Sequence, residues 1–153
     1  MTRNTGTDAR VQTGFAAGTR VMTFDGPIAV DFLEPGDRVI TRRGVRILRA
    51  IHVREQRDAP AVVIRASALG HGRPARTITV AAGQPMLVRD WRARTLFGED
   101  QALVRADRLA DGTFVTCVTA EVLRTFALAF DQPQVVYAEG TEFVMDTAAE
   151  QVG

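Results

Sequence analysis

The sequence predicts a single all-β domain, because closely spaced turns separate short runs of β-branched and other apolar residues. Strands at this spacing are typical of a sandwich or a barrel rather than of alternating strand–helix units. A chain of 153 residues, 46% of them hydrophobic, is long enough to bury one core without disulfides. The turn signals lie at Asp25-Gly26, Pro35-Gly36, Arg43-Gly44, Gly70 to Pro74, Asp111-Gly112 and Glu139-Gly140.

The elements follow from these runs in chain order. Phe126, Leu128 and Phe130 alternate with alanines, the period of a half-buried strand. Short helical turns are expected at Val30 to Leu33, Ala66 to Leu69 and Val104 to Leu109. The other strands are expected at Arg20 to Phe24, Arg38 to Thr41, Val45 to Val53, Ala61 to Arg65, Thr77 to Val80, Met86 to Val88, Phe114 to Val118 and Gln134 to Tyr137.

Charge and cysteine content argue against several classes of protein. All 19 basic residues are arginine, and with 18 acidic residues the net charge is +1, which gives no basis for nucleic-acid binding. The single Cys117 can form neither an intrachain disulfide nor a structural zinc site. No run approaches the ~20 apolar residues of a membrane span. Residues Met1 to Gly14 are too polar for a signal peptide, so the compartment stays open: cytoplasmic, or exported without an N-terminal signal.

The residue types that could bind a cofactor or a metal lack the required context. Gly70 to Ala75 matches the dinucleotide pattern G-x-G-x-x-A, which needs a strand before it and a helix after it. Here a helical turn is expected before the motif and a strand after it, which favours an arginine-bearing connector. His52 and His71 have no metal-ligand spacing, so both are interpreted as surface or strand-edge residues. We therefore expect no cofactor and no metal.

Cys117 and a group of arginines also have ordinary structural interpretations. A lone cysteine is a nucleophile only when a histidine lies near it, and the apolar neighbours of Cys117 favour a buried, slowly reacting thiol. Arg42, Arg43, Arg46 and Arg49 alternate between the two faces of a strand. They are interpreted as a solvated edge that discourages strand pairing.

Several blocks, in order, resemble the bacterial type of Hint (Hedgehog/intein) domain over about Phe15 to Phe143. The resemblance implies a flattened, curved β fold with pseudo-twofold character and one to three short helical turns. The ends of the chain show no pattern, so a mobile N-terminal tail is expected at 1–13 and a C-terminal tail at 146–153, with the Hint-like domain at 14–145. The matching blocks are Gly14 to Gly26, Val30 to Thr41, Ile64 to Arg76 with Val80, Met86 to Val88, Leu96 to Asp100 and Ala138 to Gly140.

The same resemblance implies a chemistry whose reactive groups are replaced here. Hint domains use a first-position Cys for an N-to-S acyl shift and a later His that protonates the departing amide nitrogen. Those positions fall on Gly14 and Gln84, a small hydroxyl position falls on Ala81, and two later histidine positions fall on Ala127 and Pro133. We expect Gly14 and Gln84 to lie together in one cleft of a degenerate site. Gly14→Cys with Gln84→His is then expected to restore some cleavage.

The sequence thus favours a degenerate Hint domain that keeps the scaffold without autoprocessing, and two alternatives to this function stay open. One is residual autoprocessing at the Thr13-Gly14 junction, although Thr13 points to the opposite side of an extended chain and has no adjacent base. The other is an interaction module that holds a peptide or protein segment by strand-edge pairing. An intact mass separates the first from the second.

Overall fold

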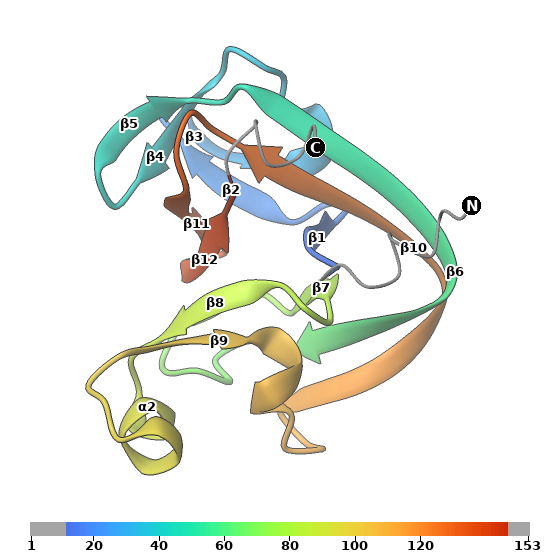
Figure 1. Ribbon diagram of the computed structural model, residues 1–153, viewed down its shortest axis with the longest axis vertical. Helices are drawn as coiled ribbons and strands as arrows, with labels where there is room; N and C mark the ends of the chain where they lie inside the picture. The colour runs from blue at the N-terminus through green and yellow to red at the C-terminus, as the bar shows by residue number, and fades with distance from the viewer. Residues whose placement is uncertain (1–11, 147–153) are drawn as a thin grey trace.

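The computed structural model describes residues 12–146, which form a curved all-β molecule with one α-helix (Figure 1). The expected tails therefore lie outside the described residues, apart from Gln12, Thr13 and Asp146. The helical elements are η1 (Val30–Phe32), α2 (Trp91–Phe97) and η2 (Ala106–Leu109), the first and last being 3-10 turns. Within the described range, no helix has the length and apolar character needed to cross a membrane.

The strands form a four-stranded closed barrel and an eight-stranded sheet, and all pairings are antiparallel. The barrel has the order β1-β10-β6-β7, and the sheet has the order β3-β2-β4-β11-β12-β8-β9 with β5 paired to β4. In chain order the strands are β1 (Phe15–Ala16), β2 (Arg20–Thr23), β3 (Gly26–Ala29), β4 (Arg38–Thr41), β5 (Gly44–Ile47), β6 (Ala50–Ile64), β7 (Ile78–Ala81), β8 (Pro85–Val88), β9 (Ala102–Arg105), β10 (Val115–Ala129), β11 (Gln134–Ala138) and β12 (Thr141–Met145).

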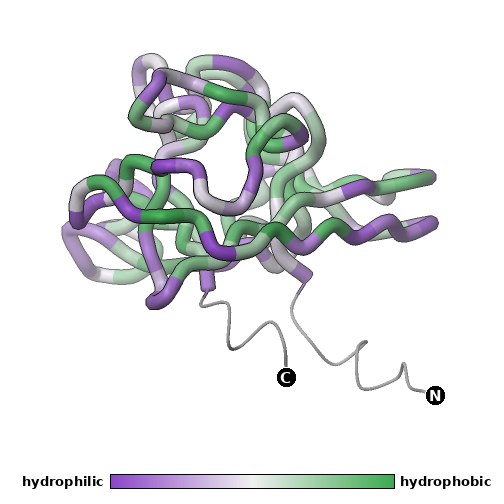
Figure 2. Tube along the Cα trace, turned by 90° about the horizontal axis from the view of Figure 1, so that it is seen from above, coloured by the Kyte–Doolittle hydropathy of each residue, from purple (hydrophilic) through white to green (hydrophobic). Residues whose placement is uncertain are grey.

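The two longest strands, β6 and β10, pair from end to end apart from Asp58 and Glu121, and they make a bent ribbon. The pairing runs from Ala50 opposite Ala129 to Ile64 opposite Val115. In Figure 1 this ribbon is the arc that joins the part of the molecule containing β2 to β5 with the part containing β8, β9 and α2. Figure 2 shows the middle of the ribbon projecting from the body. The ends of the ribbon thus belong to the main core, whereas its middle holds a small separate cluster of buried residues, Ala59, Ala61 and Leu123.

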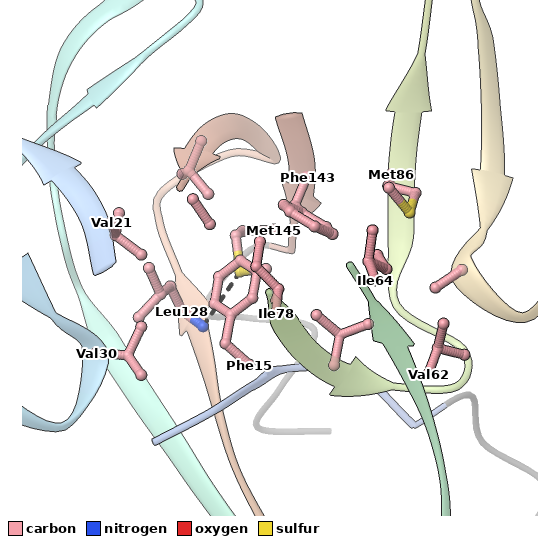
Figure 3. Close-up of a cluster of buried hydrophobic side chains, with 14 of the residues drawn as sticks. Phe15, Val21, Val30, Val62, Ile64, Ile78, Met86, Leu128, Phe143 and Met145 are labelled. Atoms are coloured by element: carbon pink, nitrogen blue, oxygen red, sulfur yellow. Dashed lines mark hydrogen bonds between the residues drawn. The ribbon is translucent and has the colours of Figure 1, made fainter. Parts of the chain in front are cut away.

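One hydrophobic core runs through both sheets (Figure 3). Phe15 from β1 meets Phe143 from β12 edge to face, with ring centroids 5.0 Å apart. Aromatic rings favour this geometry because the positive edge of one faces the negative face of the other. Leu128 of β10 and Ile64 of β6 bring the two ends of the ribbon into the same cluster.

The predicted all-β fold is confirmed, and the differences lie in the ends and the joins of elements. The run expected at Val45 to Val53 is interrupted, because the backbone of Leu48 pairs with Gly36 and Asp37 (2.7 and 2.9 Å) between β5 and β6. The run at Phe114 to Val118 and the alternating segment from Phe126 belong to one strand, β10. That segment is buried on both faces rather than half-buried, since its alanines are enclosed as well.

Two helical predictions also need correction. Ala66 to Leu69 forms turns and no helix. The segment at Val104 to Leu109 begins as the end of β9 and only then becomes η2. The helix α2 was not predicted. Its N-cap is Asp90, whose side chain accepts a hydrogen bond from the Arg92 backbone N–H (3.0 Å), and its C-cap is Gly98 in the left-handed conformation.

Candidate functional site

The residue at the implied nucleophile position, Gly14, lies directly before β1 and touches the residue at the implied histidine position. The Gly14 backbone N–H donates a buried hydrogen bond of 2.8 Å to Oε1 of Gln84. Gln84 lies between β7 and β8, 70 residues further along the chain. The expected proximity of Gly14 and Gln84 is therefore confirmed.

The backbone of Gly14 adopts a conformation that leaves no room for a side chain. Its φ of +117° is one that residues with a Cβ rarely adopt. A Cβ built there would lie 3.0 Å from Cβ of Thr125 and 3.1 Å from both C and O of Phe126. Two of these three contacts are with backbone atoms of β10, which cannot move aside as a flexible side chain can. The space that a nucleophile would occupy is filled by β10.

The Gln84 carboxamide is fully enclosed, and each of its polar atoms has a partner. Its Nε2 donates to the carbonyls of Pro85 and Val144, both at 2.9 Å, while Oε1 accepts from Gly14. These partners determine the orientation of the amide, since two carbonyl oxygens require donors and one N–H requires an acceptor. Gln84 consequently links β1, β8 and β12 in the interior.

Two other replaced positions lie beside this junction, and one does not. The Ala81 backbone N–H donates to the Gly14 carbonyl (3.0 Å), so β7 runs alongside Gly14. Ala127 follows Phe126 on β10 and is buried. Pro133 is exposed in the loop between β10 and β11, where it lines a surface pocket with Arg42 and other residues. The structure therefore gathers Gly14, Ala81, Gln84 and Ala127 but leaves Pro133 outside.

The prediction for Cys117 is wrong, because this cysteine is exposed. Its strand carries apolar residues, but the ribbon leaves the core just beyond the buried Val115. His71 is exposed in a loop, whereas His52 is half-buried on β6 opposite Ala127. The Nε2 of His52 is enclosed and has no hydrogen-bond partner within residues 12–146. In that same range, no group of three or more His, Cys, Asp or Glu could hold a metal ion.

The group of Arg42, Arg43, Arg46 and Arg49 lies along a solvent-exposed edge, and two of these arginines pair with carboxylates. Arg49 forms an ion pair with Asp131 at 3.0 Å, and Arg42 lies 3.6 Å from Glu142. Arg43 and Arg46 are exposed in the β4–β5 hairpin. The residues Gly70 to Ala75 form turns that lead towards β7, which is a connector and not the strand–turn–helix unit of a dinucleotide site.

Glu139 belongs to a predicted turn and to the Ala138 to Gly140 block, but nothing in the sequence singles it out as a buried charged group. This carboxylate is buried and pairs with Arg20 (3.1 Å) and Arg76 (2.9 Å). Its backbone also pairs with Arg20 and with Ala75, which ties the β11–β12 turn to β2 and to the approach to β7. Burial acts to raise the pKa of Glu139, but the hydrogen bonds from Arg76 and Arg20 outweigh it and hold the pKa below its usual value. No local sequence signal identifies these partners.

Comparison with known proteins agrees with this architecture. A protein-family model described as a Hint domain matches residues 13–144. Among solved structures, the chain is similar to the bacterial intein-like domain from Clostridium thermocellum, with 18% identity and a TM-score of 0.57 over 88% of this chain and 98% of that one. It is also similar to a DnaB intein from Synechocystis sp. PCC 6803, with 14% identity and a TM-score of 0.57 over 88% of this chain and 99% of that one.

A search of curated proteins finds no significant match. At these identities the structural likeness establishes the fold alone, whereas the family model covers most of the chain and establishes membership. The chain belongs to the Hint domain family.

Proposed function

We propose that this chain is a degenerate Hint domain, without autoproteolytic or splicing activity, that is retained as a scaffold or interaction module. The observation that carries the proposal is the closed junction at Gly14. An N-to-S or N-to-O acyl shift needs a thiol or hydroxyl on the residue after the scissile bond. Gly14 has neither, and β10 fills the space that a side chain would need.

The hydrogen bond at the same junction opposes the second chemical requirement. A departing amide nitrogen must receive a proton from a general acid. Here Gln84 Oε1 accepts the hydrogen of that nitrogen at 2.8 Å, and a carboxamide has no proton to give near neutral pH. The contact therefore stabilises the intact Thr13–Gly14 peptide.

Thr13 does not supply a substitute nucleophile. Its hydroxyl lies on the acyl side of the Thr13–Gly14 bond, so attack on its own carbonyl would close a strained four-membered ring. No charged or imidazole group is hydrogen-bonded to Gly14 to assist such a step, within the described residues. The remaining role is that of a framework, with strand edges that can accept a peptide or protein segment.

The intact mass of the purified chain, incubated with and without a strong thiol, tests this proposal. We expect the full 16.7 kDa species in both conditions. A thiol-dependent loss of the segment ending at Thr13 would establish residual autoprocessing and overturn the proposal. We propose residues 14–145 as the domain, and limited proteolysis followed by mass analysis would show whether cleavage is confined to the segments outside it.

The double variant Gly14→Cys with Gln84→His separates two causes of inactivity, the missing reactive groups and the packing of the junction. Block alignment alone predicts partial cleavage for it, but the structure now leads us to expect none. The side chain introduced at position 14 would collide with Phe126 backbone atoms, and the histidine would follow a backbone shaped around Pro85. Cleavage by a folded double variant would show that the junction opens more readily than its packing indicates.

A further inference from the structure

Strand edges without a neighbour are the sites where one chain can add a strand to another. Within residues 12–146, five strands have such an edge: β3, β5 and β9 at the margins of the large sheet, and the middle parts of β6 and β10. Among these residues, β6 gains a second neighbour at Ala61–Ile64, beside which the Pro60 carbonyl accepts from the Ala82 N–H (3.4 Å), and β10 gains one at Thr125–Phe126. The middle of the ribbon therefore has an open edge on each side.

Four of these five edges carry features that discourage pairing. β3, β5 and β9 are four residues long each, and they contain Pro27, Arg46 and Arg105 respectively. The open part of β6 contains Asp58, at a left-handed φ of +49°, and Pro60, which has no N–H to donate. Short length, proline, charge and local distortion are the usual protections of a strand edge.

The open edge of β10, residues 116–124, lacks the proline and the short length that protect the other edges. It is nine residues long and contains no proline and no glycine, and its charged residues are Glu121 and Arg124. Val118 and Val122 are 36% and 50% exposed, although valine favours a paired strand. Val118, Ala120 and Val122 share one face because they alternate along the strand. This edge thus carries exposed valines and is long enough to accept another strand, and its ladder with β6 skips Glu121 alone within 116–124.

The sequence of this edge is complementary to itself. When two copies run antiparallel about a two-fold axis at Ala120, Val118 of each copy lies opposite Val122 of the other. Thr119 then lies opposite Glu121, and Thr116 lies opposite Arg124. No charged residue faces its own copy, and the exposed valines cover one another.

We propose that a second copy of this chain pairs with the open edge of β10 in this register, giving a continuous antiparallel sheet of β6, β10 and their two counterparts. The inference deepens the interaction role proposed above by naming the edge and its occupant. It does not depend on whether the Thr13–Gly14 bond is intact. The protection of the other edges selects the open edge of β10, and its self-complementary register selects a second copy as the occupant.

A set of charge variants at Val118 and Val122 tests the register in solution, with sedimentation velocity as the measurement. Val118→Arg with Val122→Arg places arginines opposite each other twice, and we expect the dimer dissociation constant to rise about tenfold or more. Val118→Arg with Val122→Glu places opposite charges together twice, so it should associate far better than the double arginine variant. Both positions are exposed in the single chain, but Val122 lies opposite Arg57 on β6, so urea denaturation of each variant checks that its folding is unchanged.

The matched control lies on another edge. Val45, which is 40% exposed on β5, is replaced by arginine and should leave the dissociation constant unchanged. A dimer that dissociates in the Val45→Arg variant but not in the Val118→Arg, Val122→Arg double variant would overturn the proposal. So would equal weakening in the Arg–Arg and Arg–Glu variants.

A cross-link reports the position of the axis. Ala120→Cys in a Cys117→Ser background should form a disulfide-linked dimer on mild oxidation, because opposed residues of antiparallel strands have Cα atoms about 4.5–5.5 Å apart, within disulfide range. The natural Cys117 should not cross-link in the dimer, since it would lie six residues from its own copy, on the order of 20 Å away.

Other occupants of the edge give different results. A chain that remains monomeric at about 1 mM overturns the proposal. Protection of residues 116–124 from hydrogen exchange in that monomer would show that a segment of the same chain covers the edge. Intact mass measured on each sample separates this outcome from a failure of the proposed function.

Discussion

The Gly14–Gln84 junction and the middle of the β6–β10 ribbon differ in whether their polar groups have hydrogen-bond partners within the described residues. At the junction every polar atom of a buried glutamine is paired. In the ribbon, strand edges and two valines face outwards within the described range. In the first region, Gly14 and Gln84 are packed and hydrogen-bonded to each other in the core. In the second, the molecule presents groups suited to a partner.

We therefore expect substitutions at the junction to lower the free energy of unfolding far more than substitutions in the ribbon. Gln84→Leu should have the largest effect, because it leaves the Gly14 N–H and the Val144 carbonyl buried without partners. We expect a loss of about 3–5 kcal/mol in the free energy of unfolding, measured by urea denaturation. A loss below about 1 kcal/mol would mean that water reaches these groups and that the junction is not closed.

Gly14→Ala should cost somewhat less, about 2–4 kcal/mol, from backbone strain and overpacking together. Gly18→Ala is its matched control, since Gly18 also has a positive φ (+88°) but has nothing within 4 Å of a built Cβ. Gly18→Ala should therefore show the strain alone. Equal losses of unfolding free energy in the two variants would argue against crowding by Phe126.

Glu139 is a second buried and fully paired group, and its contribution to stability depends on pH. Its pKa is depressed in the folded state, so its stabilising effect is present above the unfolded pKa of about 4.3 and is lost as pH falls through the lower folded pKa. Glu139→Gln should cost about 1–3 kcal/mol at pH 7. Urea denaturation of both proteins should show this difference shrinking towards pH 3. A difference that does not change with pH would assign the loss to shape rather than to charge.

The smallest effect on stability is expected in the ribbon. Cys117→Ser should change the unfolding free energy by less than about 0.5 kcal/mol, because exposed positions contribute little. The thiol of the folded wild-type monomer should react with a soluble alkylating reagent at a rate close to that of the urea-unfolded chain. Strong protection of Cys117 in a dilute, monomeric sample would show that part of this chain already covers the ribbon.

Local patterns were sufficient for the class of fold and for most elements of the large sheet. Turn pairs and β-branched runs predict β2, β4, β8 and β11 close to their observed bounds, because these signals act over a few residues. The 3-10 turn before Pro35 follows from the same kind of signal. The two-residue β1 could not be predicted, since it exists only through its pairing with β7 and β10.

For the site, the order of blocks in the sequence was enough to bring Gly14 and Gln84 together as an expectation, whereas the replacement of the reactive groups stays a prediction. Tertiary structure decided the rest. The backbone of β10 fills the space beside Gly14 from more than 100 residues away, and the two arginine partners of Glu139 come from distant segments. Whether Cys117 is buried or exposed could not be inferred from its apolar neighbours, because a strand shows the same alternation whether it lies in the core or projects from it. Which stretches of β10 are covered depends on the bend of the ribbon, and that bend is a property of the packed molecule.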